Sequence, residues 1–355
     1  MSQVYGNLKF LRFTDHLEAV REGRLIAPVH VRIKPINRCN HDCWYCAYRV
    51  GNLDLGSDMR EEDAIPEDRM LAIADDLVEM GVKAVTFSGG GEPLIYKPLP
   101  KVVERLAQGG IKVASLTNGS NLRGNMADSF AQYGTWIRVS VDGWDDESYC
   151  KSRGIKGDAF TKLLDNMRNF AARGSNCVLG VSFIISEANH TRVFEVCRLF
   201  KETGVHHVKI SGAVISNNLT ENNLYHRKIT AVVTDQIAQA KTELDDSRFQ
   251  VINHYHELEE RFEKDYHRCP FLQFLTIIGA DQSVYTCQDK AYTDSGLLGS
   301  FKDQSFKDFW FSDETRAKVW ALDPARQCRH HCVAHAKNLA INDYLNIDPN
   351  HGLFV

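Results

Sequence analysis

The sequence predicts an α/β fold built on a parallel sheet. Between about residues 28 and 212, short β-branched runs alternate with amphipathic stretches in six β-α repeats. Crossovers that all run in one direction imply a parallel sheet, either open or curled into part of a barrel. A glycine precedes each of the last five runs, where a helix needs a left-handed cap before the next strand: Gly81, Gly110, Gly134, Gly174 and Gly204.

The order of the elements follows from periodicity. The strand candidates are 29–36, 83–89, 111–117, 136–142, 178–186 and 207–211. In the helical pattern "DRMLAIADDLVEMG", apolar residues recur at helical spacing: Met70, Leu71, Ile73, Ala74, Leu77 and Val78. A polar loop and a long helix follow residue 212, and short strands and then helices follow Cys269. We therefore expect an N-terminal extension (1–24), a repeat domain (25–212), a helical bridge (213–268) and a C-terminal domain (269–355).

Composition narrows the class of protein. The 355 residues are 43% hydrophobic and 25% charged, and the net charge of −4 gives no reason to expect a nucleic-acid partner. No stretch has the apolar length of a signal-peptide core or a membrane span, so we expect a cytoplasmic protein without a membrane partner. Thiols stay reduced in the cytoplasm, and the ten cysteines therefore need a use other than disulfides.

Three cysteines form the first of two groups. Cys39, Cys43 and Cys46 are spaced C-x3-C-x2-C and follow the first strand directly, so they lie at the edge where parallel α/β folds build their sites. A zinc site with a distant fourth ligand, or a cluster of buried thiols, would explain them. A [4Fe–4S] cluster with three irons held by thiolates and the fourth left open is the sharper hypothesis.

The three-cysteine loop, with Tyr45 just before its last cysteine, resembles the signature of the radical S-adenosylmethionine (radical SAM) superfamily. The second strand ends in "FSGGGEPL", which is similar to the family's Gly-Gly-Glu-Pro element. The resemblance implies that this element binds the methionine amino group of the cofactor, and that the aromatic ring forms a wall for its adenine. The residues concerned are Tyr45, Ser88, Gly89, Gly90, Gly91, Glu92 and Pro93.

Later strand ends resemble the family as well. Asn118 lies in "LTNGS", and Ser140 and Asp142 alternate on one strand, where relatives reach the ribose hydroxyls. Arg153 stands where relatives hold the cofactor carboxylate, a task that suits a planar donor. Ser182 and Asn189 are equally well explained as cofactor-binding residues or as hydrogen-bonded core residues.

One isolated cysteine lies near this end of the fourth strand. Cys150 is most simply a buried thiol that behaves as a small apolar side chain. Its position also makes it a candidate catalytic residue, as a hydrogen donor.

The second group comprises Cys269, Cys287, Cys328 and Cys332, enough for one fully ligated cluster or a structural zinc site. Their context resembles the C-terminal extension called SPASM, or its short form Twitch, and four cysteines imply a single auxiliary [4Fe–4S] cluster. The glycine that the family places five residues before the second cysteine is Gln282 here. Three nearby histidines are alternative ligands: His330, His331 and His335.

Together these features imply a partial (β/α)6 TIM-type barrel with a small SPASM/Twitch-like α+β domain. The resemblance implies an enzyme of the oxidoreductase or mutase type that reductively cleaves S-adenosylmethionine to a 5′-deoxyadenosyl radical. An electron donor such as flavodoxin or ferredoxin would be its partner. Only 38 residues precede Cys39, few for a leader-binding domain. We therefore expect a small-molecule substrate, such as a sugar, an aminocyclitol or a nucleotide sugar, that is oxidised, epimerised or rearranged.

Two other functions fit the same residues. The first is a radical SAM enzyme that modifies a ribosomally made peptide. The second is a non-catalytic zinc or iron–sulfur protein, for example a sensor, which would have no use for the glycine-rich loop.

Overall fold

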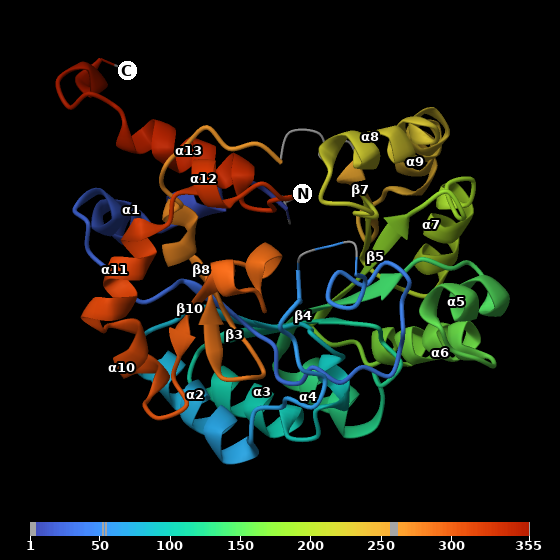
Figure 1. The fold of residues 1–355 in the computed structure, drawn as a ribbon. Helices are drawn as coiled ribbons and strands as arrows, with labels where there is room; N and C mark the ends of the chain where they lie inside the picture. Colours follow the sequence, from blue (N-terminus) through green and yellow to red (C-terminus); the bar gives the residue numbers. More distant parts are fainter. Residues whose placement is uncertain (1–4, 52, 54, 256–261, 355) are drawn as a thin grey trace.

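The computed structural model describes residues 5–51, 53, 55–255 and 262–354. It confirms the fold class: a curved parallel sheet forms a partial TIM-type barrel, and an α+β domain follows (Figure 1). All six expected strands are present and pair in sequence order through parallel ladders. They are β1 (His30–Ile33), β2 (Ala84–Phe87), β3 (Lys112–Thr117), β4 (Gly134–Val141), β5 (Val178–Ile185) and β6 (His207–Gly212).

Helices cover the outer side of this sheet (Figure 1). The expected amphipathic helix is α2, and its residues Met70, Ile73, Ala74 and Leu77 are buried in the core beneath the strands. Apolar strand residues that face outward join the same core, which explains why this face excludes water. The covering helices are α2 (Glu67–Glu79), α3 (Leu99–Gln108), α4 (Gly124–Tyr133), α5 (Asp146–Arg153), α6 (Ala159–Ala171) and α7 (Val193–Glu202).

The glycines before the strands follow the prediction at four of five positions. Gly81, Gly110, Gly174 and Gly204 have φ between 62° and 85°, in the left-handed region. Gly134 differs, because its φ is −72° and it is the first residue of β4. A Cβ there would lie 2.5 Å from the Phe130 carbonyl oxygen, so glycine lets α4 pass directly into β4.

The sheet extends beyond the six expected strands to ten in the described residues. The expected helical bridge contains α8 (Leu219–Arg227) and α9 (Thr230–Leu244), and also β7 (Gln250–Asn253), which pairs with β6. At the opposite edge, β8 (Leu275–Ile278) pairs in parallel with β1. The antiparallel strands β9 (Ser283–Tyr285) and β10 (Leu297–Ser300) follow. The C-terminal part therefore continues the barrel wall, and the four-part division stays a prediction.

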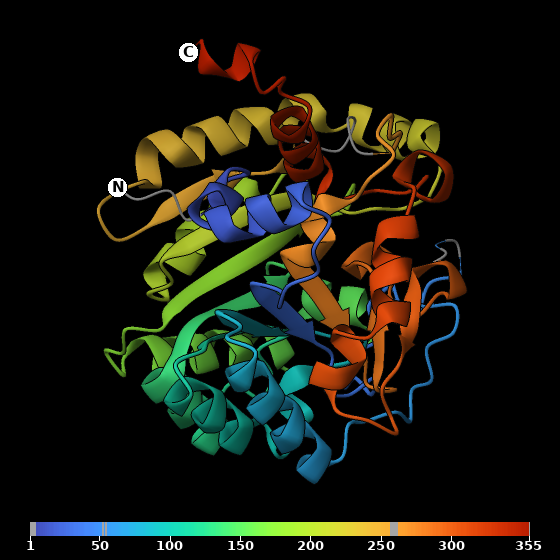
Figure 2. The same cartoon turned by 90° about the vertical axis from the view of Figure 1, so that its left-hand side faces the viewer.

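The tail ends in a group of helices, the last of which packs against the beginning of the chain (Figure 2). These are α10 (Phe306–Trp310), α11 (Asp313–Ala321), α12 (Pro324–Gln327) and α13 (His335–Leu345). Leu17 of α1 (Thr14–Arg21) belongs to a small core with Phe10, Phe274 and Ile341, which joins the N-terminal extension to α13. In the part of the chain that the structure describes, no helix is long and apolar enough to cross a membrane.

The inner, concave face of the sheet is polar. Burial alternates along β1, β4 and β6, so that outward residues such as Val31 and Ile33 are fully buried while their inward neighbours keep accessible surface. Arg32, Arg138 and Lys209 are inward residues of β1, β4 and β6. The concave face therefore carries positive charge where a barrel of this size often holds aliphatic side chains.

Candidate functional site

The three-cysteine loop lies between β1 and α2, at the carboxyl end of the parallel strands. Its backbone is held against the end of α5, since Asp42 N donates to the Arg153 carbonyl at 2.8 Å. Cys46 N donates to the Cys43 carbonyl at 3.0 Å, which folds the loop back on itself. The structure thus brings the three cysteines into one compact loop, and all three are partly exposed.

The thiols of this loop influence one another. Burial raises the pKa of Cys43 to about 11, the Arg153 guanidinium opposes this, and the neighbouring Cys46 and Cys39 raise it further. Burial likewise raises the pKa of Cys39. Thiols of this kind keep their protons at neutral pH, and a metal must displace those protons to bind.

The glycine run after β2 packs directly under the cysteine loop. A Cβ on Gly90 would lie 2.2 Å from Asn37 Oδ1, and one on Gly91 would lie 1.9 Å from the Arg38 carbonyl oxygen. Gly91 N also donates to the Ile36 carbonyl at 3.1 Å. Glycine is therefore required here for the contact between the two loops, in addition to any approach to a ligand.

Glu92 is a buried anchor of the glycine loop. Its carboxylate accepts hydrogen bonds from Leu94 N at 2.9 Å, from Asn118 N at 2.7 Å and from the Thr117 hydroxyl. Burial raises the pKa of Glu92, while these hydrogen bonds and the charge of Arg153 lower it. A cofactor role for Glu92 stays a prediction, because the structure uses its carboxylate to connect β2 to β3.

Ser88 is the residue of this loop with unused hydrogen-bonding capacity. Its side chain is 4% exposed, and its Oγ has no partner among the described residues. A buried hydroxyl without a partner costs about 1–3 kcal/mol, which is unusual unless a ligand or water completes it.

Arg153 and Asp142 form a buried ion pair at the carboxyl end of β4. Arg153 Nε lies 2.6 Å from Asp142 Oδ1, and the two side chains are 3% and 4% exposed. The guanidinium also donates to the Ser140 carbonyl at 2.9 Å and to Cys43 Sγ at 3.5 Å. It lies over the ring of Tyr45, 5.6 Å from the centroid. Arg153 thus joins β4 to the three-cysteine loop.

The remaining sequence-predicted residues lie around this pair. Ser140 and Ser182 are register partners on β4 and β5. Asn118 donates to Asn40 Oδ1 at 2.8 Å, which links the end of β3 to the cysteine loop. Asn189 donates to the Asp142 carbonyl at 2.7 Å, and a cofactor role for Asn189 or Ser182 stays a prediction.

Cys150 lies on α5 and is partly exposed. Its thiol donates to the Gly157 carbonyl at 3.2 Å, so it is directed toward the loop between α5 and α6. A role for Cys150 as hydrogen donor stays a prediction.

The four tail cysteines also gather. Burial raises the pKa of Cys269 to about 12, and the neighbouring Cys332 and Cys328 contribute to the shift. All three in turn raise the pKa of Cys287, after burial and Asp289. Asn338 Nδ2 donates to Cys269 Sγ at 3.3 Å. The four thiols come from three segments of the tail and influence one another electrostatically.

One of the three candidate histidines, His330, lies beside the tail cysteine Cys287. The ligand atoms of Cys287, Asp289 and His330 lie within 4.8 Å of one another. His331 makes an edge contact with Phe262, and His335 Nδ1 lies 3.2 Å from the Tyr266 hydroxyl.

Gln282 adopts a backbone conformation that usually favours glycine. Its φ is 60°, in the left-handed region, and its N donates to the Gly279 carbonyl at 3.0 Å in the turn between β8 and β9. The departure from the family pattern therefore changes the residue and leaves the turn intact.

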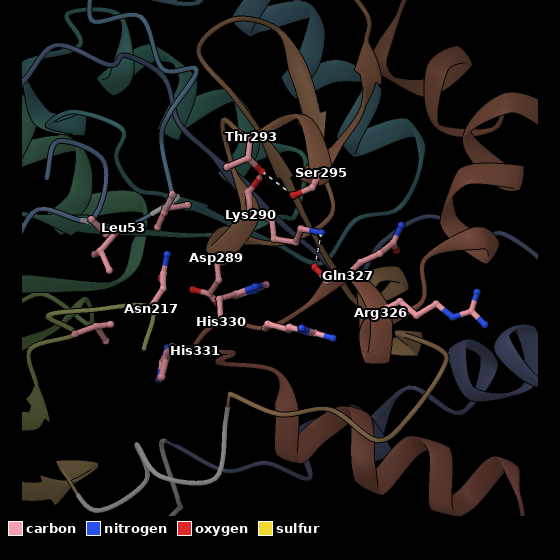
Figure 3. A pocket seen from close by; sticks show the side chains of 14 residues that line it. Leu53, Asn217, Asp289, Lys290, Thr293, Ser295, Arg326, Gln327, His330 and His331 are labelled. Atoms are coloured by element: carbon pink, nitrogen blue, oxygen red, sulfur yellow. Dashed lines mark hydrogen bonds between the residues drawn. The ribbon is translucent and has the colours of Figure 1, made fainter. Parts of the chain in front are cut away.

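A cavity of about 280 Å³ lies between the segment that follows Cys46 and tail segments next to Cys287 and Cys328. Ala47, Leu53 and Leu55 from the cysteine loop line one side, with Val214 and Asn217 that follow β6. The other side comes from the tail, where Asp289 and His330 point toward the space (Figure 3). A second hollow of about 670 Å³ lies beside Trp44, Asp142 and Ser152.

Lys34 and Tyr48 connect the cysteine loop to the tail beneath this cavity, and neither was identified from the sequence. Lys34 is fully buried, and its Nζ donates to the Tyr48 hydroxyl at 2.6 Å and to the Gly89 carbonyl at 2.8 Å. Burial and then Arg32 lower the pKa of Lys34, while Asp289 and Cys46 raise it. The sequence signal that could have identified Lys34 is its alternation with His30 and Arg32 along the first strand, which places all three side chains on one face.

His30 on the concave face gives the fold a measurable pH dependence. Its Nε2 lies 2.8 Å from Thr86 Oγ1, and burial, with a contribution from Arg32, lowers the pKa to about 3. The unfolded chain takes up this proton below about pH 6.5 and the folded chain does not, so stability is lost as the pH falls. We expect His30 to account for about 2 kcal/mol of the loss in unfolding free energy between about pH 6.5 and 4.5.

Chemical denaturation at several pH values checks this. In His30→Gln, the loss in unfolding free energy between about pH 6.5 and 4.5 should be smaller by about 2 kcal/mol. An unchanged pH dependence in the variant would show that His30 has the same pKa in the folded and unfolded chain.

The fold and the three-cysteine loop define the class. Residues 33–186, somewhat less than half of the chain, match the family model described as "Radical SAM superfamily", and this segment is a radical SAM domain. Such a domain implies a [4Fe–4S] cluster and S-adenosylmethionine as cofactors.

Two curated relatives share parts of the chain. It is 34% identical over 120 residues to the S-adenosylmethionine-dependent nucleotide dehydratase of Lacinutrix mariniflava, covering 34% of this chain and 25% of that protein. It is 24% identical to the probable GTP 3′,8-cyclase of Sulfurisphaera tokodaii, covering 60% and 64%. The chain thus spans less than two thirds of either relative.

Among solved structures, SuiB of Streptococcus suis bound to S-adenosylmethionine has a similar fold, with a TM-score of 0.64 at 15% identity. The likeness covers 94% of this chain and 80% of SuiB, so it includes the C-terminal α+β domain.

Proposed function

We propose that this chain is a radical SAM enzyme that acts on a small molecule held in the cavity between its two groups of cysteines. The proposal rests on one observation: the cavity is lined by the three-cysteine loop on one side and by the four-cysteine tail on the other. A volume of about 280 Å³ lies near the lower end of small-molecule sites and suits a small substrate better than an extended peptide.

The residues present fit the cofactors. Cys39, Cys43 and Cys46 would hold three irons of one [4Fe–4S] cluster, and a fourth protein ligand is absent from the motif. The partnerless Ser88 Oγ is a donor or acceptor for S-adenosylmethionine. When bound, these cofactors supply a 5′-deoxyadenosyl radical that abstracts hydrogen from a C–H bond.

The chain's own residues then have distinct tasks. Arg153 donates to Cys43 Sγ and fixes the loop to β4. Glu92 holds the glycine loop in place through backbone donors. Lys34 and Tyr48 close the wall between the cysteine loop and the tail, which limits the entry of water.

The tail thiols would hold one auxiliary [4Fe–4S] cluster. Cys269, Cys287, Cys328 and Cys332 are sufficient for full ligation, and His330 is an alternative ligand next to Cys287. If these residues hold a cluster, it would supply an acceptor for an electron from a substrate radical, which favours oxidation among the possible net reactions. A reduced flavodoxin or ferredoxin would supply electrons, and the thiols favour a cytoplasmic location.

The substrate class remains part of the proposal. Both curated relatives are named for reactions of nucleotides. This favours a sugar or nucleotide-like substrate that is oxidised, epimerised or rearranged. Peptide modification is the second candidate, because a SuiB structure of similar fold is bound to its precursor peptide.

Metal analysis and cofactor cleavage test the proposal. Anaerobically reconstituted protein should contain about eight irons per chain, and Cys269→Ala combined with Cys287→Ala should leave about four. With dithionite and S-adenosylmethionine the wild-type protein should form 5′-deoxyadenosine. One zinc per chain and no 5′-deoxyadenosine would favour a non-catalytic metal protein instead.

A further inference from the structure

The concave face of the barrel holds two arginines whose Nε atoms lack hydrogen-bond partners among the described residues. Arg32 on β1 and Arg138 on β4 each have an Nε that is inaccessible to solvent and has no partner among the described residues. Arg138 uses another donor, since its Nη1 donates to the Tyr5 hydroxyl at 2.9 Å. A buried N–H of a cation is costly without an acceptor, so these two Nε atoms indicate a missing partner.

The pKa values of neighbouring groups reflect the same positive charge. Burial and then the charge of Arg138 lower the pKa of His207 to about 4, and His206 contributes further. Burial lowers the pKa of Arg32 itself, which Arg138 lowers further while Tyr48 and Asp289 oppose it. The pKa of His30 is lowered in the same way, by burial and then by Arg32. Neighbouring cations therefore add to the effect of burial at three inward side chains on two strands, β1 and β6.

Asp289 connects these cations to the cavity. Its carboxylate lines the cavity beside His330 (Figure 3), and it acts electrostatically on both Arg32 and Lys34. Arg32 lies two residues before Lys34 on the inward side of the same chain segment. Lys34 Nζ donates to the Tyr48 hydroxyl at 2.6 Å, and that hydroxyl donates to the Gln288 carbonyl, next to Asp289, at 3.5 Å. The lining of the cavity also includes the cationic residues Lys290, Arg326 and Arg329.

We propose that Arg32, with Arg138 beside it, binds an anionic group of the substrate, either a phosphoryl group or a carboxylate. The planar guanidinium fork matches both groups. The inference rests on the proposed function in one respect, namely that the substrate occupies the cavity between the two groups of cysteines. It adds that the substrate enters with its anionic end toward the floor of the barrel.

Binding of simple anions to the full-length, anaerobically reconstituted protein tests this. The probes are pyrophosphate, malonate and the neutral sugar glucose, measured by calorimetry at one ionic strength so that general screening is equal. We expect Arg32→Gln to weaken anion binding by about 10- to 100-fold, as the loss of a charge-assisted hydrogen bond predicts. Arg138→Gln should weaken it as well.

The control is Arg168→Gln, which removes an exposed guanidinium paired with Asp165 on the outside of α6 and should leave anion binding unchanged. Preference for pyrophosphate would identify a phosphoryl group, and preference for malonate a carboxylate. Either preference supports the inference if it is lost in Arg32→Gln.

Absence of anion binding, or binding equal in wild type and Arg32→Gln, would overturn the inference. Equilibrium dialysis with S-adenosylmethionine separates this from failure of the proposed function. Arg32→Gln should bind the cofactor like the wild type, which also shows that the variant is folded. If the cofactor does not bind to any form while Arg32-dependent anion binding persists, the proposed function fails and the anion site stands.

Discussion

Cys43→Ala is expected to lose the proposed N-terminal cluster, and with it the cleavage of S-adenosylmethionine. Cys43 would hold one of three irons, and its thiol also accepts the hydrogen bond that anchors the loop to Arg153. Outer-shell substitutions already lower metal affinity or activity about 10- to 100-fold, so loss of a ligand should exceed about 100-fold. The iron content should fall by about four per chain, and 5′-deoxyadenosine formation should fall to background.

Cys197→Ala is the matched control, because Cys197 is fully buried on α7 and belongs to the apolar core. It should lower stability by about 1 kcal/mol and leave the iron content unchanged. If Cys43→Ala retained all of its iron and its cleavage rate, the three-cysteine loop would not be the site of the cofactor.

Arg153→Met should lower the unfolding free energy of the metal-free protein by about 3–5 kcal/mol. The substitution leaves the Asp142 carboxylate buried without its cation, and the two side chains are almost inaccessible to water. Ser152 Oγ also donates to Asp142, but a neutral donor does not compensate a buried charge. Guanidinium denaturation under reducing conditions, followed by tryptophan fluorescence, measures the effect.

A double-mutant cycle identifies the cause. Asp142→Asn combined with Arg153→Met should recover most of the lost stability, because no buried charge remains. Arg168→Met, which removes the exposed partner of Asp165, should cost less than about 1 kcal/mol. Additive losses at Asp142 and Arg153 would contradict the assignment of a coupled buried pair.

Local patterns were enough to predict the barrel. β-branched runs and helix-capping glycines mark the six strands, because strand and helix periods are properties of the local sequence. The pairing of β8 with β1 could not be predicted in this way. The two strands are separated by more than 240 residues, and their contact depends on how the whole tail folds.

The candidate site also contains some residues that short motifs predict and others that only the tertiary structure identifies. The cysteine spacing and the Gly-Gly-Glu-Pro element are short motifs, and the sequence therefore predicted residues that the structure places side by side. The role of Glu92 as an anchor depends on donors from β3, which no motif around Glu92 reveals. Lys34 and Tyr48 were missed for the same reason, since their importance comes from contact with the tail.

The most direct test of the open cluster is electron–nuclear double resonance on the dithionite-reduced protein with S-adenosylmethionine labelled with ¹⁵N at its amino group. If Cys39, Cys43 and Cys46 leave one iron for the cofactor, a ¹⁵N hyperfine coupling should appear in the wild type. It should persist when Cys287 is replaced by alanine and disappear in Cys43→Ala. A reduced cluster that shows no such coupling in the wild type would contradict the open site on which the proposed chemistry depends.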